Sequence, residues 1–233
     1  MLIIAEIGVN WDGDFQLLKK MLQKAKSVGC DLVKFQAFTK EMIKDHPESD
    51  RLMKSSISTK NIQQINDLSN EIGIEWFCTP MYPEAVDFLN PYVKRFKIRE
   101  FDSRPLFDNS STPLFEKILK TGKEIFISTE KLPFKLDYYN NPKINWLYCI
   151  PKYPCLIDEI DFEKIHKIGG FSNHCPLSDA LIKAVEAGAT ILEVHVTFDK
   201  QKNFIDNNVS FDFNELEMII KTINKKTSNT SCD

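Results

Sequence analysis

The sequence lacks the motifs that would assign it to several common functional classes. It contains neither the dinucleotide motif GxGxxG nor the phosphate-loop motif GxxxxGK[ST], so a nucleotide-binding fold has no support. No apolar run approaches the roughly 18 residues of a membrane-spanning helix. The amino terminus has no basic region of the kind that begins a signal peptide, and it leads directly into an apolar segment. We therefore expect a cytoplasmic protein that does not contact a membrane.

The chain also lacks a strong excess of one charge and any clustering of cysteines. It has 30 Lys and Arg against 33 Asp and Glu, and this net charge of −3 gives no general attraction to nucleic acid or to anionic lipid. The six cysteines follow no CxxC spacing and lie mostly in apolar segments, which indicates reduced thiols. Cys175 follows His174 and is a candidate metal ligand, although a packed thiol is the interpretation we favour.

What the sequence does contain is a repeated alternation of short apolar strands and amphipathic helices. An apolar share of 42% is sufficient for a buried core, and 233 residues fit one large domain. The patterns predict eight strands, at residues 2–8, 31–38, 75–80, 93–99, 124–129, 144–150, 171–174 and 190–197. They predict helices at residues 15–28, 60–72, 83–89, 113–121, 157–168, 177–187 and 213–224.

Four segments depart from this alternation. Residues 40–60 are polar and contain several serines, and we interpret them as a long excursion on the active-site side, a candidate lid. Residues 100–111 are expected to form a loop. Residues 131–142 contain two prolines and an Asn-Asn pair, so the helix after the fifth strand is expected to be short or absent. Residues 225–233 are expected to be a frayed tail.

Eight strands alternating with about seven helices favour a (β/α)₈ barrel, or TIM barrel, over an open doubly wound sheet. A barrel gathers the carboxyl ends of its strands into one mouth, whereas an open sheet spreads them along an edge. Polar residues lie at or near these strand ends: Glu6, Lys34, Thr79, Lys97, Ser128, Ser172, His174 and His195. We therefore predict a single-domain barrel over residues 1–224 with its functional site at the mouth.

Two histidines, His174 and His195, lie near the ends of consecutive strands, so a parallel barrel places them side by side. Two neutral imidazoles with room for oxygen ligands suit a divalent first-row metal such as Mn, Co, Fe or Zn. The alternative is that each histidine is a hydrogen-bonded structural residue. The spacing alone leaves both interpretations open.

Two lysines, Lys34 and Lys97, lie among several hydroxyl side chains at the same strand ends. Together they predict a polycationic, donor-rich face that suits a phosphate or a carboxylate. Alternatively, either lysine forms a Schiff base, as in metal-free aldolases, or pairs with a nearby carboxylate. Glu6 and Asp206 are candidates for acid–base catalysis or for accepting hydrogen bonds from a sugar.

The order of eight short segments resembles that of the N-acetylneuraminate (sialic acid) synthase family. From Ile3 to about Ile220 these segments are IIAEIGVNWDG, KFQAF, CTP, FKI, IST, a Tyr-Pro pair after the sixth strand, SNHC and EVHVTFD. The resemblance implies a (β/α)₈ barrel that condenses phosphoenolpyruvate with an N-acyl amino sugar such as N-acetylmannosamine. The products would be a nonulosonic acid and phosphate, formed by a metal-assisted attack on the open-chain aldehyde.

The resemblance also implies roles for individual residues. His174 and His195 match the two metal-binding histidines, with Mn²⁺ as the first choice and Mg²⁺ or Co²⁺ as alternatives. Positions that hold phosphoenolpyruvate are matched by Lys34, Thr79, Lys97, Ser128 and Ser172. Positions that handle the sugar and the reacting atoms are matched by Glu6, Asn10, Gln36, Tyr153 and Asp206. Among all of these, the catalytic roles are expected of Glu6, Lys34, Lys97 and Asp206.

Several positions differ from the residue types usual in that family: Trp11, Glu130, Pro151 and Asn173. In addition, Glu100 falls where a small serine-bearing turn is usual, and it would repel phosphoenolpyruvate unless Arg99 or Arg104 neutralises it. Members usually carry a carboxy-terminal antifreeze-like domain that caps the partner's site and contributes an arginine. This sequence ends after the barrel, so a local arginine or a separate capping protein would have to replace it.

We therefore expect a phosphoenolpyruvate-dependent, metal-assisted synthase that acts on a small sugar, as a homodimer. One alternative is a non-catalytic or partner-dependent barrel that binds a sugar or a biosynthetic partner. A third interpretation is a metal-dependent aldolase or sugar-phosphate synthase of another barrel family, which keeps the two histidines and changes the substrate.

Overall fold

A computed structural model describes residues 1–230, and side chains as far as residue 226. Within these residues eight parallel strands pair in sequence order, and they close into a barrel because β1 pairs with both β2 and β8. The strands are β1 Leu2–Glu6, β2 Leu32–Ala37, β3 Glu75–Pro80, β4 Arg95–Ile98, β5 Glu124–Thr129, β6 Ile144–Cys149, β7 Gly170–Asn173 and β8 Ile191–Thr197. The predicted (β/α)₈ barrel is confirmed.

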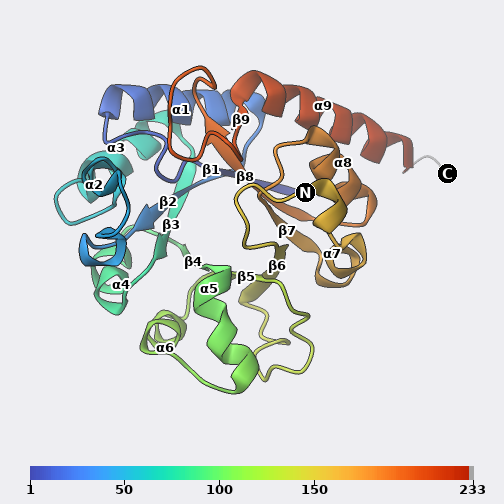
Figure 1. The fold of residues 1–233 in the computed structure, drawn as a ribbon, viewed down its shortest axis with the longest axis horizontal. Coiled ribbons are helices and arrows are strands. Elements are labelled where there is room, and N and C mark those ends of the chain that lie inside the picture. Colours follow the sequence, from blue (N-terminus) through green and yellow to red (C-terminus); the bar gives the residue numbers. More distant parts are fainter. Residues whose placement is uncertain (231–233) are drawn as a thin grey trace.

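Helices surround the strands, and Figure 1 shows α1 and α9 lying side by side along one edge of the molecule. The α-helices are α1 Phe15–Val28, α2 Ser49–Ser55, α3 Ile62–Ile72, α4 Pro83–Leu89, α5 Glu100–Ser103, α6 Pro113–Lys120, α7 Phe162–Ile168, α8 Ser178–Glu186 and α9 Phe213–Thr230. Short 3₁₀ helices are η1 Glu41–Ile43, η2 Arg104–Asp108 and η3 Ile157–Glu159. Within the described residues no helix is long and apolar enough to cross a membrane.

Helix α1 shows how the sequence sets these elements. The side chain of Asp14 accepts hydrogen bonds from the backbone N–H groups of Gln16 and Leu17, which caps the first turn. Apolar side chains recur at helical spacing on the face toward the barrel, and four of them are buried: Leu18, Met21, Leu22 and Ala25. Gly29 ends the helix at φ 97°, a left-handed conformation that glycine adopts without strain.

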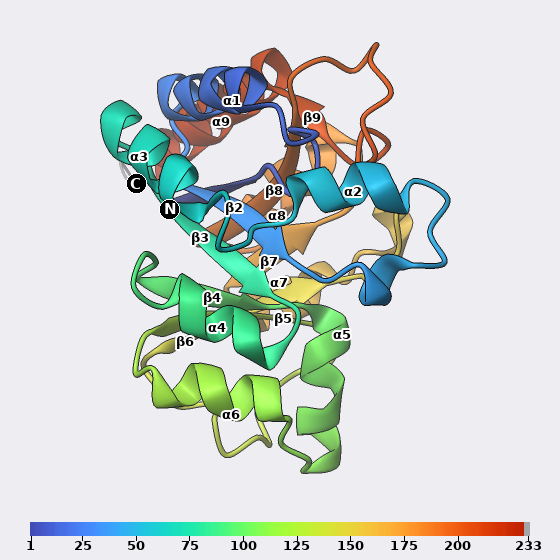
Figure 2. The same ribbon diagram turned by 90° about the vertical axis from the view of Figure 1, so that its left-hand side faces the viewer.

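The barrel interior is filled below its mouth. Phe77 of β3 and Phe126 of β5 come from strands on either side of β4, yet their ring centroids lie 5.4 Å apart and both rings are fully buried. Gly170 allows β7 to approach β6, because a Cβ there would lie 2.5 Å from the carbonyl oxygen of Trp146. In Figure 2, α2, α5 and the connection from β8 to β9 all lie toward the carboxyl ends of the strands.

The segment between β5 and β6 behaves as predicted. Residues 130–143, all of them described, form turns but no helix. Aromatic side chains occupy this side of the barrel instead, since the rings of Phe115 and Tyr138 pack edge to face with centroids 4.9 Å apart. The prediction of a short or absent fifth helix is confirmed.

Three predicted boundaries are wrong. Residues 100–111 were expected to form a loop, but α5 and η2 form there because Arg99–Asp102 and Glu100–Arg104 ion pairs bridge successive turns. The helix expected over residues 157–168 is divided into η3 and α7, because the side chain of Asp161 caps the amino terminus of α7. The last helix was predicted to end at residue 224 but extends to Thr230, and the rest of the segment expected to be a frayed tail, residues 231–233, lies outside the described residues.

One short strand was not predicted. Residues Phe211–Asp212 form β9, which pairs in parallel with the end of β8, with Val196 opposite Phe211. This pairing anchors the far end of the connection that leaves β8 at the mouth of the barrel.

Candidate active site

The carboxyl ends of the strands surround a cavity of about 470 Å³. Eleven of the twelve residues predicted for the site line it: Glu6, Lys34, Gln36, Thr79, Lys97, Ser128, Tyr153, Ser172, His174, His195 and Asp206. The strand register explains this gathering, because Glu6 lies opposite Lys34 on one side and opposite His195 on the other. The barrel thus brings side chains from all parts of the chain to one place.

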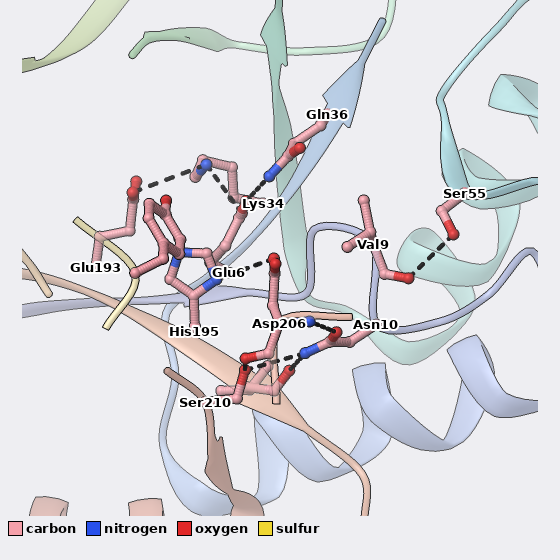
Figure 3. Close-up of polar contacts among 12 residues, drawn as sticks. Glu6, Val9, Asn10, Lys34, Gln36, Ser55, Glu193, His195, Asp206 and Ser210 are labelled. Atoms are coloured by element: carbon pink, nitrogen blue, oxygen red, sulfur yellow. Dashed lines mark hydrogen bonds and ion pairs between the residues drawn. The ribbon is translucent and has the colours of Figure 1, made fainter. Parts of the chain in front are cut away.

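Two lysines and two glutamates form a buried charge network on the cavity floor, and Figure 3 shows Lys34, Glu6 and Glu193 of this network. Lys34 Nζ lies 2.9 Å from an oxygen of Glu6 and 3.8 Å from an oxygen of Glu193. Lys97 Nζ donates a 2.9 Å hydrogen bond to the other oxygen of Glu193. Ser172 donates a further 2.8 Å hydrogen bond to that carboxylate. The two positive charges are therefore matched by two negative ones, so the prediction of a polycationic face is wrong for the free protein.

The network also shifts the pKa values of its members. Burial alone would raise the pKa of Glu193, but Lys34 and Lys97 outweigh it and lower the pKa to about 2. Burial lowers the pKa of Lys97, an effect that Glu193 only partly offsets and that Lys34 reinforces. For Lys34 the attraction of Glu193 and Glu6 exceeds the effect of burial, and its pKa is raised. Glu193 is consequently a carboxylate at neutral pH.

Glu193 was not among the residues predicted for the site. It precedes His195 by two positions on β8, and residues two apart on a strand share a face. That spacing could have identified it, because His195 was already assigned to the cavity. Its apolar neighbours in the sequence ILEVHVT made the glutamate inconspicuous.

The two histidines lie next to each other, with ring centroids 5.3 Å apart. His174 Nδ1 is 2.7 Å from the carbonyl oxygen of Ile150; since a carbonyl only accepts, Nδ1 carries the proton and Nε2 has a free lone pair. Tyr153 packs its ring over His174, centroid to centroid 3.9 Å, and places its hydroxyl 3.5 Å from His195 Nε2. His195 Nδ1 lies 3.4 Å from a carboxylate oxygen of Asp206.

A divalent metal bound at this pair would have two protein ligands. Burial, reinforced by repulsion from His195, lowers the pKa of His174 to about 3, so the ring is neutral and able to coordinate at physiological pH. His195 Nδ1 is buried and has no hydrogen-bond partner in the described part of the chain. Among residues 1–230 no three His, Cys, Asp or Glu side chains are arranged to hold a metal, so other ligands would be water or substrate oxygens.

The cysteines do not complete such a site. The five cysteines in the described residues are free and buried, and Cys232 lies outside those residues. Cys149 is the cysteine that lines the cavity, and its sulfur lies 3.7 Å from His174 Nδ1. Burial raises its pKa to about 12, so it remains a thiol rather than a ligating thiolate. Cys175 is fully buried and lies outside the cavity lining, which fits the packed thiol that we favoured.

The neutral state of His174 gives a pH-dependent stability. An unfolded histidine has a pKa of about 6.5, so between about pH 6.5 and pH 3 the unfolded chain binds a proton that folded His174 does not. This contribution is complete above pH 6.5 and is lost as the pH falls, by up to about 1.4 kcal/mol per pH unit. We expect the Tm of the metal-free protein to decrease over this window and His174→Gln to decrease less steeply. Exposed His166→Gln should retain the wild-type slope; equal slopes in all three proteins would contradict the assignment.

Asn10 is the predicted site residue that does not line the cavity. It is fully buried, and its amide donates to the carbonyl oxygen of Val196 and to Ser210, both at 3.0 Å. Its side-chain oxygen accepts a 3.0 Å hydrogen bond from the backbone N–H of Asp206 (Figure 3). The structure therefore does not support a direct contact between Asn10 and a substrate. Asn10 instead positions the segment that carries Asp206.

Gln36 and Gly8 shape the position of Glu6. Gln36 Nε2 donates a 2.7 Å hydrogen bond to the Glu6 oxygen that does not face Lys34. Gly8 has φ 51°, and a Cβ there would lie 3.0 Å from that same oxygen. Both carboxylate oxygens of Glu6 are thus fixed by their neighbours.

Residues 40–60, the candidate lid, are attached to the barrel by several hydrogen bonds. Trp11, one of the positions expected to differ from the resembled family, is fully buried and donates from its indole nitrogen to the carbonyl oxygen of Ser55 at 3.2 Å. The Ser55 hydroxyl donates to the carbonyl oxygen of Val9 at 3.0 Å. Arg51 forms a two-point ion pair with Asp12, at 2.7 and 2.9 Å. These contacts fix the segment beside the mouth.

The other departures from the family pattern have local explanations. Asn173 exchanges two hydrogen bonds with the backbone of Cys175, which shapes the turn that presents His174. Glu130 is exposed and lies outside the cavity lining. Glu100 does line the cavity, and Arg104 neutralises it with a 2.7 Å ion pair, as the sequence required. Nothing in the structure explains Pro151, which lies at the cavity edge.

Comparisons with known proteins agree over nearly the whole chain. Residues 21–231 match the model of the NeuB family. An uncharacterized protein of Methanocaldococcus jannaschii is 30% identical over 239 residues, which cover 95% of this chain and 69% of that one. The N,N'-diacetyllegionaminic acid synthase of Legionella pneumophila is 28% identical over 254 residues, covering 95% of this chain and 70% of that one.

A solved structure is similar in fold. It is the N-acetylneuraminic acid (sialic acid) synthetase from Leptospira borgpetersenii in complex with citrate, with a TM-score of 0.84 and 22% identity over 96% of this chain and 82% of that one. At that identity the likeness shows the barrel fold, while the extent of the family match carries the assignment. The chain belongs to the NeuB family, a family that includes sugar-acid synthases.

Proposed function

We propose that the protein condenses phosphoenolpyruvate with the open-chain aldehyde of an N-acyl amino sugar, releasing phosphate and a nonulosonic acid. The observation that carries this proposal is the cavity itself, where two buried lysines lie beside two adjacent histidines. Anion-binding groups next to a metal-binding pair are what a reaction between a phosphorylated acid and an aldehyde requires. The names of the family's characterised members are consistent with that reaction.

The floor of the cavity would hold phosphoenolpyruvate. Lys34 and Lys97 would exchange part of their contact with Glu6 and Glu193 for the phosphate and carboxylate of the ligand, as charge-assisted hydrogen bonds. Ser128 supports this placement, because its buried hydroxyl has no hydrogen-bond partner among the described residues. Thr79, which accepts a 3.2 Å hydrogen bond from Lys34, adds a second hydroxyl.

His174 and His195 would hold the divalent metal, with Mn²⁺ as the first candidate and Mg²⁺ or Co²⁺ as alternatives. When bound, the metal would polarise the aldehyde oxygen of the sugar. The Ile150 carbonyl keeps the lone pair of His174 Nε2 free for that purpose, and the carboxylate of Asp206 beside His195 would orient the second ring.

The reaction also needs a base and a proton source. The aldehyde oxygen gains a proton as the new carbon–carbon bond forms, and the enol carbon gains a hydroxyl from water, which loses a proton. The resulting tetrahedral carbon then breaks its bond to the phosphate oxygen and becomes a ketone, and the proton of its hydroxyl leaves with the phosphate. Glu6, whose carboxylate is fixed by Gln36 and Lys34, would accept the proton from water. Asp206 and the Tyr153 hydroxyl lie on the histidine side, where the developing alkoxide would accept a proton.

Phosphate release tests this function. The protein is incubated with phosphoenolpyruvate, one of Mn²⁺, Mg²⁺ or Co²⁺, and a panel of N-acyl hexosamines, and inorganic phosphate is measured together with the sugar product. We expect release that requires both the metal and the aldehyde. Absence of release with every aldehyde and metal would contradict the proposal.

Ligand binding separates the enzyme from a barrel that only binds sugar. A ligand at a hundredfold its Kd stabilises a protein by about 2.7 kcal/mol, so phosphoenolpyruvate should raise the Tm measurably. The Ser128→Ala variant removes one unpartnered hydroxyl and should weaken this shift while leaving the ligand-free Tm near that of the wild type. A protein that shows no shift with phosphoenolpyruvate would instead support the non-catalytic alternative.

A further inference from the structure

Arg51 of α2 joins three segments at the mouth of the barrel. Its Nε and one terminal nitrogen donate to the two carboxylate oxygens of Asp12, at 2.9 and 2.7 Å. The same terminal nitrogen donates a 2.6 Å hydrogen bond to the carbonyl oxygen of Asn203, and the other pairs with Glu48 at 2.8 Å. Since Asp12 follows β1 and Asn203 follows β8, one guanidinium connects α2 to the loops after two neighbouring strands. We call Arg51, Asp12 and Asn203 the Arg51 cluster.

The loop after β1 is shaped to receive α2. Asp12 has φ 51°, a left-handed conformation that aspartate adopts more readily than most residues. Gly13 follows it, and a Cβ there would lie 2.6 Å from the carbonyl oxygen of Lys54. The loop and the helix are therefore in direct contact, and the side chains of Arg51 and Asp12 are only 27% and 25% exposed. A two-point pair shielded in this way fixes its partners better than a fully exposed ion pair does.

The connection after β8 carries both Asn203 and Asp206, and it is compact between them. The backbone N–H of Asn207 donates a 3.2 Å hydrogen bond to the carbonyl oxygen of Phe204, which closes a turn around Asp206. From the other side, the Asn10 side chain accepts a hydrogen bond from the backbone N–H of Asp206 (Figure 3). Because the turn is closed, a displacement of Asn203 also displaces Asp206.

Asp206 is the residue of this connection that reaches the histidine end of the cavity. Its carboxylate lies 3.4 Å from His195 Nδ1, a buried nitrogen without a hydrogen-bond partner among the described residues. That distance is at the long end of what a hydrogen bond allows, so a small outward displacement of Asp206 would end the contact. A misplacement of about 1 Å in an active site can lower a rate by about 10²-fold.

We propose that Arg51 is a positioning residue, which holds the Asp206 carboxylate beside His195 through Asp12 and Asn203. Its catalytic consequence rests on the proposed function, whereas the placement of Asp206 does not depend on that function. Arg51 is outside the cavity lining, so it acts without touching a substrate. The lid segment thus controls the histidine end of the cavity from the opposite side of β1.

Steady-state kinetics test this role. Arg51→Met removes the guanidinium and retains an apolar stem. With phosphoenolpyruvate, Mn²⁺ and the best acceptor of the panel, we expect its kcat for phosphate release to decrease by about 10- to 100-fold. The KM for phosphoenolpyruvate should stay within about twofold, because the two buried lysines make no contact with the Arg51 cluster. Arg51→Lys keeps the charge without the two-point geometry and should restore part of the loss.

A double-mutant cycle separates positioning from general destabilisation. In an Asp206→Asn background, Arg51→Met should lower kcat by less than about twofold more, because both changes act on the same contact. Asp50→Ala is the matched control, since it removes an exposed partner of Lys40 on the same helix and should leave kcat unchanged. A wild-type kcat in Arg51→Met, or a decrease equally large in both backgrounds, would overturn the proposal.

Hydrogen exchange measured by mass spectrometry tests the placement without the reaction. Backbone amides of residues 203–210 should exchange at least about 10-fold faster in Arg51→Met than in the wild type or Asp50→Ala. Unchanged exchange would overturn the proposal whatever the kinetics show. If the wild type releases no phosphate with any acceptor, the proposed function fails, and the exchange rates alone decide whether Arg51 holds the segment of Asp206.

Discussion

Replacing His174 by alanine should abolish specific Mn²⁺ binding and lower the rate of phosphate release by at least about 10²-fold. Metal polarisation of a carbonyl contributes several kcal/mol to transition-state stabilisation, and each 1.4 kcal/mol is a factor of about ten in rate. A site with two protein ligands depends strongly on each, because His195 alone would leave the ion held mainly by water. The loss should therefore affect kcat far more than the KM for phosphoenolpyruvate.

The measurement combines calorimetric titration of Mn²⁺ with the phosphate assay. His166→Ala is the matched control, since that histidine is exposed on α7 and its Nδ1 contacts the carbonyl oxygen of Ala187. It should bind Mn²⁺ with wild-type affinity. Undiminished Mn²⁺ binding by His174→Ala would show that the imidazoles are structural, which is the interpretation that the sequence left open.

Replacing Glu193 by alanine should produce the largest loss of stability. Removing one partner of a buried ion pair costs about 3–5 kcal/mol, because the opposite charge remains buried without compensation. Glu193 is 3% exposed and contacts both lysines and Ser172, so its loss strands two positive charges. For a domain of this size, such a cost corresponds to a decrease in Tm of about 6–20 °C.

Thermal unfolding of three variants isolates the effect. Glu193→Gln retains the shape and a hydrogen-bonding oxygen for Ser172, so its Tm should lie between those of Glu193→Ala and the wild type. Glu217→Ala removes an exposed partner of Lys221 on α9 and should leave the Tm nearly unchanged. Phosphate or another small anion should partly restore the Tm of Glu193→Ala by pairing with the lysines. A Glu193→Ala protein as stable as Glu217→Ala would show that the network does not stabilise the fold.

Much of the site could be predicted because the carboxyl ends of all strands lie close together in a parallel barrel. A polar residue near the end of an apolar strand, such as Lys34 or His195, must lie at the mouth if the barrel closes. The sequence could not show how charges pair across strands. Lys97 and Glu193 are separated by 96 residues, and their 2.9 Å contact exists only in the closed barrel.

The errors have a similar origin in side-chain pairing. The helical turn of α5 depends on Arg99 and Glu100 finding partners three and four residues later, whereas the sequence Arg-Glu-Phe-Asp reads locally as a polar loop. Asn10 was expected to contact the substrate because it matches a position that handles the sugar in the resembled family, and it lies outside the cavity lining. Its three hydrogen bonds to residues near position 200 depend on the long connection after β8, which the local pattern does not reveal.

The rings of Phe77 and Phe126 fill the barrel interior beside the two lysines, because Phe77 lies opposite Lys34 and Phe126 lies opposite Lys97 in the strand register, and this filling affects how ligands enter the cavity. The cavity that the described residues form is entered at its mouth, where the partly exposed Ile43 and the largely exposed Phe101 line the doorway. A ligand that binds at the lysines must enter before the ligand that binds at the doorway. It cannot leave until the ligand at the doorway has left. We therefore expect the two substrates to bind in a fixed order. An excess of the second substrate should inhibit the reaction, because it occupies the doorway before the first substrate has entered.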